Sequence, residues 1–415
     1  MLKYPFAYDC AVRTKYVAAR VLPDAENLII SGAVVVEGDR IAWVGPAAEA
    51  PEAETVVDLA EAVLMPGLVN AHSHLDLTHL RGAVPYHGEF APWLAGIAEG
   101  RERPGMHGAA VWGVKEALSR GTTAFGDIVA PGNFDEMVKV FAETGARGRL
   151  FVETIGFRPE VADRAFERVW ELAEMKALPE TVATGLSPHS AYAVSRPLLD
   201  RAVAMADGHG APLAVHFAET LEELAFLRHG IGPLRDLLKR FDADDPEHAP
   251  YGTAQAFLAQ LQLPHAPLLL VHCNYLRPRD VPAGAFVVYC PTAHRFFGHP
   301  EHPVLELLEE GVRVVLGSDS AASGETVDVL SETQHLSRAR TDLSPRAVFR
   351  MVTDWAARAL GLDAGTLAPG KLADLAAFTP ALDQEILGHQ EARCVLTVVG
   401  GRVLWRAEPD ADGRV

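Results

Sequence analysis

The stretch VLMPGLVNAHSH, residues 63–74, decides the predicted fold class of this chain. It is an almost continuous apolar run, which is typical of a buried strand in a parallel sheet that helices cover. Two histidines close the run, and residues two apart on a strand point to the same side, so His72 and His74 lie next to each other. The sequence therefore predicts a strand over Val63–His74 that ends in a pair of imidazoles.

Seven more apolar runs follow, and helix-length stretches separate them. The predicted strands are Thr123–Val129, Gly148–Ile155, Thr181–His189, Pro212–Glu219, Pro267–Asn274, Ala285–Pro291 and Val312–Asp319. The predicted helices include Ala109–Ser119, Asp163–Met175, Arg196–Ala206, Pro303–Glu310, 325–340 and 345–361. Eight alternations of strand and helix predict an α/β protein built on a (β/α)8 TIM barrel. A doubly wound sheet is the alternative, but no G-x-G-x-x-G follows any of the strands.

Short β runs stand on both sides of the predicted barrel. They are Lys15–Val21, Gly32–Glu37, Arg40–Val44, Ala373–Phe378, Val395–Val399 and Arg402–Trp405, with hairpin turns expected at Gly38-Asp39 and Gly400-Gly401. We expect residues 1–66 and 365–415 to form one small composite β-sandwich domain beside a catalytic barrel at 67–364. The polar, proline-rich segment 220–262 is expected to be a long loop that is functional or mobile.

Composition narrows the class of partner. The formal net charge of −18 argues against a nucleic-acid surface and against binding to an anionic membrane. We see no signal peptide and no apolar run long enough to span a membrane. The four cysteines, at 10, 273, 290 and 394, form no C-x-x-C pair, which fits a reducing cytosol. The sequence predicts a cytoplasmic protein that acts on a small molecule, and it is compatible with a homo-oligomer.

Side chains that bind metals stand at the carboxyl ends of several predicted strands. These ends meet on one face of a barrel, which is where barrel enzymes build their active sites. His72, His74, His216 and Asp319 are the candidate ligands. Three histidines and one aspartate suit a single divalent metal, Zn²⁺ or Fe²⁺, and leave a position for water. The structural alternatives are a hydrogen-bonded core histidine for His216 and a helix N-cap for Asp319.

Three further residues at these strand ends are candidates for catalysis or binding. A carboxylate at Glu219 could take a proton from water and give it to a leaving amine; the alternative is a first-turn glutamate that the helix dipole favours. His272 could hydrogen-bond the reacting oxygen or be another ligand. His189 is more typical of a substrate contact than of a ligand, and the alternative is a buried structural histidine.

These residues, in this order, resemble the amidohydrolase superfamily, in its branch of cytosine/adenosine-type deaminases and chlorohydrolases. The resemblance runs from PGLVNAHSHLD (66–76) and LRG (80–82) to GTLAPGKLADLAAF (365–378). It implies that the metal ligands are His72, His74, His216 and Asp319. It also implies a catalytic set of Glu219, His272 and Asp319, in which Glu219 moves protons.

The resemblance also indicates how many metals bind and which residues hold the substrate. His189, within SPHSAYAVS (187–195), is similar to the family's substrate-binding histidine. Trp93-Leu94 resembles the WL that precedes a ribose-binding glutamate in nucleoside deaminases, and counting onward predicts Glu102 as that residue. Branches with two metals bridge them by a carboxylated lysine on strand four, which has no lysine here. One metal is therefore implied, with zinc favoured over iron.

The substrate is indicated by three longer runs. HFAETLEELAFLRHGIGPL (216–234), CPTAHRFFGH (290–299) and GSDSAASGETVDV (317–329) are similar to bacterial deaminases of 6-aminodeoxyfutalosine, an adenine-containing intermediate of menaquinone synthesis. Thr292 and Ala293 depart from the CPRSN-type pattern of those enzymes. The sequence predicts a metal-dependent aminohydrolase that deaminates an adenine nucleoside-type substrate. Open alternatives are a guanine, methylthioadenosine or S-adenosylhomocysteine deaminase, an amide or halide hydrolase, and an inactive binding protein.

Overall fold

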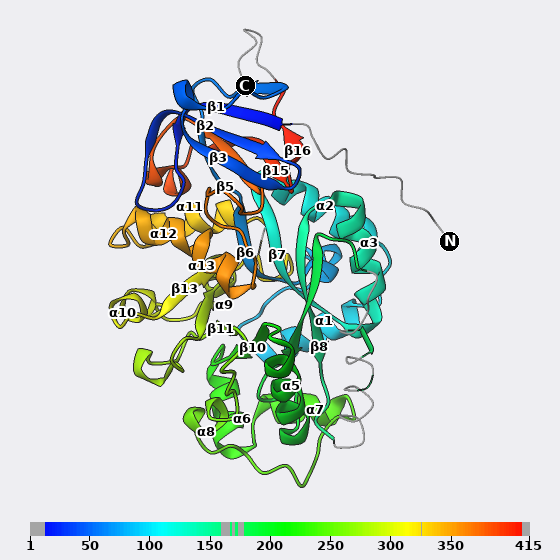
Figure 1. Cartoon of the computed structure of the whole chain (residues 1–415). Helices are drawn as coiled ribbons and strands as arrows, with labels where there is room; N and C mark the ends of the chain where they lie inside the picture. Colours follow the sequence, from blue (N-terminus) through cyan, green and yellow to red (C-terminus); the bar gives the residue numbers. More distant parts are fainter. Residues whose placement is uncertain (1–12, 159–166, 168–170, 173–177, 325, 409–415) are drawn as a thin grey trace.

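Two eight-stranded sheets organise the computed structural model of the chain (Figure 1). The structure describes residues 13–158, 167, 171–172, 178–324 and 326–408. Cys10 and most of the helix predicted at 163–175 lie outside these residues. The other three cysteines are free and buried. No helix in the described part of the chain is long and apolar enough to cross a membrane.

The first sheet is the predicted barrel. Its eight strands are parallel to their neighbours and follow the order of the chain: β6 (Leu68–Ser73), β7 (Thr122–Val129), β8 (Arg147–Thr154), β9 (Val182–Pro188), β10 (Leu213–Phe217), β11 (Leu268–His272), β12 (Phe286–Tyr289) and β13 (Arg313–Leu316). The backbone N–H groups of Ser318 and Asp319 donate to the carbonyl of His72 at 2.9 and 3.1 Å, which brings the last strand back to the first. The TIM barrel is confirmed.

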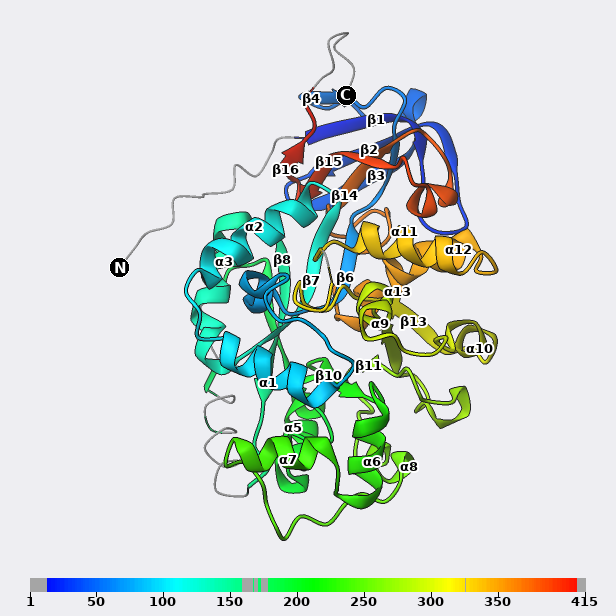
Figure 2. The same cartoon turned by 180° about the vertical axis from the view of Figure 1, so that it is seen from behind.

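Helices surround the barrel, as Figure 2 shows from behind. They are α1 (Phe90–Gly100), α2 (Met106–Leu118), α3 (Phe134–Thr144), α5 (Arg196–His209), α6 (Leu221–His229), α7 (Pro233–Arg240), α8 (Ala254–Leu258), α9 (Pro291–Phe297), α10 (Val304–Glu309), α11 (Val329–Ala339), α12 (Pro345–Met351) and α13 (Asp354–Ala359). The expectation of a long loop at 220–262 is therefore wrong for about half of the segment, because α6, α7 and α8 take up 22 of its 43 residues. The helix predicted at 345–361 is broken into α12 and α13.

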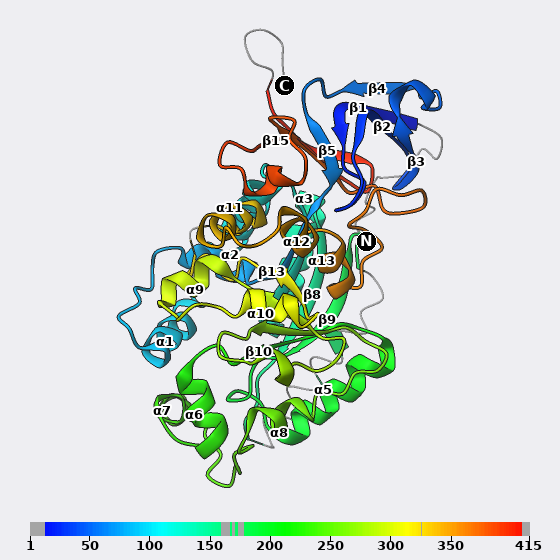
Figure 3. The ribbon, with the colours of Figure 1, turned by 90° about the vertical axis from the view of Figure 1, so that its left-hand side faces the viewer.

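The second sheet joins both ends of the chain, and the blue and red strands lie side by side in Figure 3. It contains β1 (Arg13–Val21), β2 (Ile29–Glu37), β3 (Arg40–Pro46), β4 (Thr55–Asp58), β5 (Val63–Pro66), β14 (Leu375–Thr379), β15 (Arg393–Val399) and β16 (Arg402–Arg406). Both predicted hairpins form, with Gly38, Gly400 and Gly401 at positive φ. We call these strands the terminal sheet.

The predicted strand Val63–His74 is in fact two strands that belong to different sheets. β5 pairs antiparallel with β14 in the terminal sheet, whereas β6 pairs parallel with β7 in the barrel. Gly67 lies between them, and a Cβ there would meet the Thr123 side chain at 2.3 Å, so only glycine fits this crossing. Apolar residues stand on both sides of Pro66-Gly67, and they outweighed the turn signal of this dipeptide in the prediction of one continuous strand.

A buried ion pair links the barrel to the terminal sheet. Arg147, at the start of β8, donates to Asp374, just before β14, from Nε at 2.7 Å and from Nη2 at 2.9 Å. Asp374 also accepts the N–H of Gly400 at 2.8 Å. The two side chains are only 8% and 2% exposed, so neither charge has water as a substitute partner.

Replacing Asp374 with alanine is expected to lower the free energy of unfolding by about 3–5 kcal/mol, because it leaves the Arg147 charge buried without its carboxylate. Urea denaturation of the two proteins measures this difference. Glu37→Ala is the matched control, since it breaks a half-exposed pair with Arg13 and should cost about 0–1 kcal/mol. An Asp374→Ala protein as stable as this control would contradict the expectation.

Candidate active site

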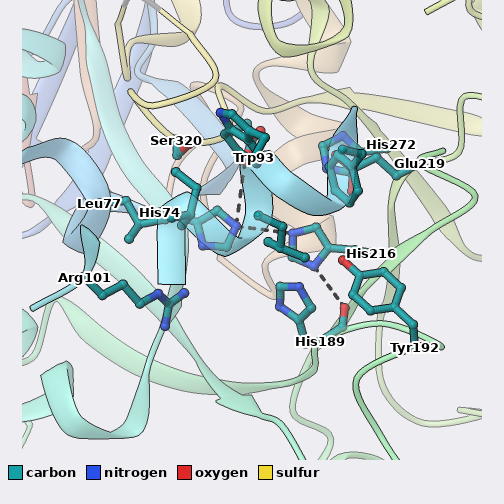
Figure 4. A pocket seen from close by; sticks show the side chains of 14 residues that line it. His74, Leu77, Trp93, Arg101, His189, Tyr192, His216, Glu219, His272 and Ser320 are labelled. Carbon is teal, nitrogen blue, oxygen red and sulfur yellow. Dashed lines mark hydrogen bonds and ion pairs between the residues drawn. The ribbon is translucent and has the colours of Figure 1, made fainter. Parts of the chain in front are cut away.

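The four predicted metal ligands converge at the carboxyl end of the barrel, where Figure 4 shows two of them, His74 and His216, side by side. His72 lies on β6 and His74 follows it, His216 lies on β10, and Asp319 follows β13. The Nε2 atoms of His74 and His216 are 3.2 Å apart. Asp319 Oδ1 lies 3.5 Å from His72 Nε2 and 3.7 Å from His74 Nε2. One ion could therefore be reached from three different strands.

The hydrogen bonding of these side chains fits a divalent metal. Both ring nitrogens of His72 and the Nδ1 of His74 are buried and have no hydrogen-bond partner among the described residues. Buried polar atoms are rarely left in this state. Burial, followed by the neighbouring histidines, lowers the pKa of His74 and of His216 well below the usual range. Neutral imidazoles of this kind, together with one carboxylate, are the donor set that suits zinc or iron.

Outer hydrogen bonds orient two of the candidate ligands. His216 Nδ1 lies 3.0 Å from the carbonyl of His189, so this nitrogen donates and Nε2 is left with its lone pair toward the cluster. The hydroxyl of Ser323 donates to Asp319 Oδ2 at 2.6 Å, which leaves Oδ1 facing the histidines. Partners of this kind hold ligands in place before a metal arrives.

The backbone around the cluster is strained. Seven non-glycine residues of the described chain have positive φ, and four of them stand at the carboxyl ends of barrel strands: Ala218, His272, Cys273 and Asp319, with φ of 51°, 72°, 55° and 57°. Left-handed conformations are unfavourable for residues with a Cβ, and they gather at functional sites where surrounding contacts hold them. The sequence contains no signal of this strain.

Glu219 and His272 form a second pair beside the cluster. Glu219 Oε1 lies 3.6 Å from His272 Nε2, and both side chains are buried. Burial, and next the carboxylates of Asp319 and Glu223, raise the pKa of Glu219 well above its usual range. A carboxyl of this kind binds a proton readily. His272 also lies close enough to His72 and Asp319 to be a ligand, so the structure keeps both of its predicted roles open.

Helix α1 forms an apolar wall of the pocket above this pair. Phe90, Trp93, Leu94 and Ile97 line the pocket from α1 at a spacing of three or four residues, and Arg101 follows at the end of the helix. The Trp93 Nε1 donor is buried and has no partner among the described residues. Tyr192 and His189 also line the pocket. A flat apolar molecule with a few hydrogen-bonding groups suits such walls.

The structure brings His189 to the pocket but not Glu102. Glu102 is exposed, and its neighbour Arg101 lines the pocket in its place. Arg101 donates to Glu153 Oε2 at 3.1 Å, and the other oxygen of Glu153 lies 2.8 Å from His189 Nδ1. Burial would raise the pKa of Glu153, but Arg101 and His189 outweigh it and hold this pKa at about 2. A carboxylate thus fixes both pocket residues.

Sequence reasoning missed Arg101, Glu153 and Tyr192. Glu153 did carry a usable signal, because it is an acidic residue near the carboxyl end of the barrel strand β8, directly after the apolar run Leu150–Val152. Tyr192 lies only three residues after His189. Arg101 carried no signal, since its direction depends on where α1 ends.

The chain matches known proteins over most of its length. Residues 63–404 match the amidohydrolase family, and residues 32–53 match the imidazolonepropionase-like composite domain of bacteria. The 5-methylthioadenosine/S-adenosylhomocysteine deaminase of Moorella thermoacetica is 30% identical over 379 residues, which cover 86% of this chain and 83% of that protein. The aminodeoxyfutalosine deaminase of Deinococcus radiodurans is 32% identical over 355 residues, 80% of this chain and 81% of that protein.

A solved structure supports the fold. The aminofutalosine deaminase of Helicobacter pylori, crystallised with methylthio-coformycin, superposes with a TM-score of 0.83 over 94% of this chain and 99% of that chain, at 20% identity. The barrel and the terminal sheet therefore agree with the sequence match. The chain belongs to the amidohydrolase family.

Proposed function

We propose that this protein is a hydrolytic deaminase of an adenine nucleoside-type substrate and that it releases ammonia. The observation that carries the proposal is the cluster of His72, His74, His216 and Asp319 with the buried carboxyl of Glu219 beside it, at the bottom of a pocket with apolar walls. Water activation and proton transfer are the two functions that hydrolytic deamination needs at one place. The deaminase relatives described above add support.

The proposed metal ligands are His72, His74, His216 and Asp319, with zinc as the first candidate. When bound there, a divalent metal would lower the pKa of a water molecule toward about 7. Glu219 accepts the proton of the attacking water as the oxygen bonds to the amino-bearing carbon. It then delivers that proton to the ring nitrogen. The second proton of the water passes from the new hydroxyl to the amine as the carbon–nitrogen bond breaks, so that ammonia departs, a carbonyl remains and the ring nitrogen keeps the first proton.

The other residues bind and orient. His272 lies beside Glu219, where it can hydrogen-bond the attacking oxygen. Asp319 is close enough to accept a hydrogen bond from the same water-derived oxygen. His189 and Arg101, tied together by Glu153, face the part of the substrate away from the amino group. The walls from α1 exclude water and cover the flat ring.

For the substrate itself we propose 6-aminodeoxyfutalosine. Thr292 and Ala293 depart from the CPRSN-type pattern of the deaminases that act on this compound. Neither residue lines the pocket. The N–H of Thr292 donates to Glu332 Oε2 at 2.9 Å, and its hydroxyl makes a short hydrogen bond to the other oxygen of Glu332, on α11. The departure therefore changes how α9 is held and not the wall that the substrate meets.

A panel of purified compounds tests this proposal. We expect ammonia release from 6-aminodeoxyfutalosine with a kcat/KM at least tenfold above those for methylthioadenosine, S-adenosylhomocysteine and 5′-deoxyadenosine, because one pocket contact discriminates by about 10- to 200-fold. Guanine and a chlorinated triazine serve as controls for other chemistry. Turnover of either control, with none of the adenine nucleosides, would contradict the proposed class, and a preference for another adenine nucleoside would change only the substrate.

A further inference from the structure

The segment that carries Glu219 has no strand to hold it. β10 ends at Phe217, and Ala218 then adopts a left-handed φ of 51°, which turns the chain so that Glu219 faces His272. A residue with a Cβ takes this conformation only when other contacts impose it. The place of the proton carrier therefore depends on whatever bonds the peptide groups of residues 218 and 219.

The hydrogen bonds of these two residues are fully accounted for. The N–H groups of Ala218 and Glu219 donate to the two oxygens of Glu223, at 3.0 and 2.8 Å. The carbonyl of Ala218 accepts the N–H of Tyr275 at 3.2 Å, and the carbonyl of Glu219 accepts Asn274 Nδ2 at 3.0 Å. Hydrogen bonds thus hold residues 218 and 219 from two sides: Glu223 binds their N–H groups, and Asn274 and Tyr275, which follow β11, bind their carbonyls.

Glu223 departs from an ordinary helix cap. Thr220 caps α6, and with Glu223 three residues later the pair has the form of a capping box. In a capping box the glutamate reaches back to the N–H of the capping residue itself. Here both oxygens of Glu223 pass beyond Thr220 and take the N–H groups of the two preceding residues. The Glu223 carboxylate therefore binds the backbone before α6 and not the N–H of the capping residue Thr220.

We propose that Glu223 is a positioning residue that sets the place of Glu219 during proton transfer. Glu223 is fully buried, and it does not line the pocket, so it acts through Glu219 and not on the substrate. The inference rests on the proposed role of Glu219 in deamination. A carboxylate is suited to this position because it offers an acceptor to each of two neighbouring N–H groups, whereas glutamine offers one acceptor and turns a donor toward the other.

The test is a double-mutant cycle between the two glutamates. Glu223→Gln alone is expected to lower kcat by about tenfold to a hundredfold, since small misplacements of a catalytic group cost this much, while KM and bound metal change little. In a Glu219→Gln background the same substitution should change kcat by less than twofold, because the group that it positions is already lost. Thr220→Ala is the matched control: it removes the cap of the same helix and should leave kcat within threefold of wild type.

The outcomes of this cycle distinguish a positioning role of Glu223 from a general effect on the fold and from a failure of the proposed function. An equal loss of kcat from Glu223→Gln in both backgrounds, or a loss matched by Thr220→Ala, would show a general effect on the fold and overturn the role of Glu223. Wild-type protein without ammonia release in the same assay would overturn the proposed function as well. If Glu223→Gln does not fold, Asn274→Ala replaces it in the cycle, since it loosens the same segment from its other side, and the same two expectations apply.

Discussion

Glu219→Gln is expected to lower kcat by about 10²- to 10⁴-fold, the usual contribution of a positioned acid and base. Glutamine keeps the size of the side chain but cannot take a proton from water or return it to the leaving amine. Glu219 is not among the four proposed ligands, so the metal should stay bound. The measurement is the steady-state rate of ammonia release from the best substrate of the panel.

Metal content and melting temperature of the Glu219→Gln protein are the controls for this expectation. Both should equal those of the wild type, because the substitution adds no volume and removes a buried carboxyl whose pKa is raised by burial. A variant with intact metal and full turnover would assign proton transfer to another group. His272 is the first alternative, because its Nε2 lies 3.6 Å from Glu219 Oε1.

Removal of the metal is expected to abolish turnover and to loosen the fold. Prolonged dialysis against a chelator should bring ammonia release below detection, and one equivalent of zinc or iron should restore it. A bound metal stabilises the native state by about 4 kcal/mol at a thousand times its dissociation constant. The melting temperature of the metal-free protein should therefore fall and recover with the activity. The metal that restores the higher kcat identifies the preferred ion.

Two histidine variants test the ligand assignment directly. His216→Ala removes one proposed ligand and should retain less than a tenth of the bound metal, measured by elemental analysis. His229→Ala is the matched control, because His229 is exposed at the end of α6 and should leave the metal content unchanged. A His216→Ala protein that still holds a full equivalent would contradict the proposed centre.

The barrel could be predicted because its strands have the same apolar composition throughout and its candidate ligands stand at their ends. Each candidate ligand lies on a barrel strand or within three residues after its end, so its place follows from the strand alone. The break at Gly67 was missed although Pro66-Gly67 marks a turn, because the strands on both sides of it are buried and begin with apolar residues. The helices at 220–262 were missed because the polar, proline-rich part of that segment outweighed the helical pattern before it.

The pocket was harder to predict than the cluster. Whether Arg101 or Glu102 faces the site depends on the rotation of the chain where α1 ends, and one residue changes the direction by about 100°. The pairing of Glu153 with Arg101 and His189 joins residues that are far apart in sequence. The hydrogen bond from the Ala218 N–H to Glu223 depends on the left-handed backbone of Ala218, which only the three-dimensional structure reveals.

The division of residues 63–73 between two sheets has a consequence for how the chain is made. β5 is synthesised early, but its partner β14 follows about 300 residues later. At about 5–20 residues per second, β14 leaves the ribosome roughly 15 to 60 seconds after β5. During this time one edge of β5 stays unpaired, and open strand edges invite wrong partners. Protection of the nascent chain therefore matters most for β5, which can pair with β1 early but with β14 only near the end of synthesis.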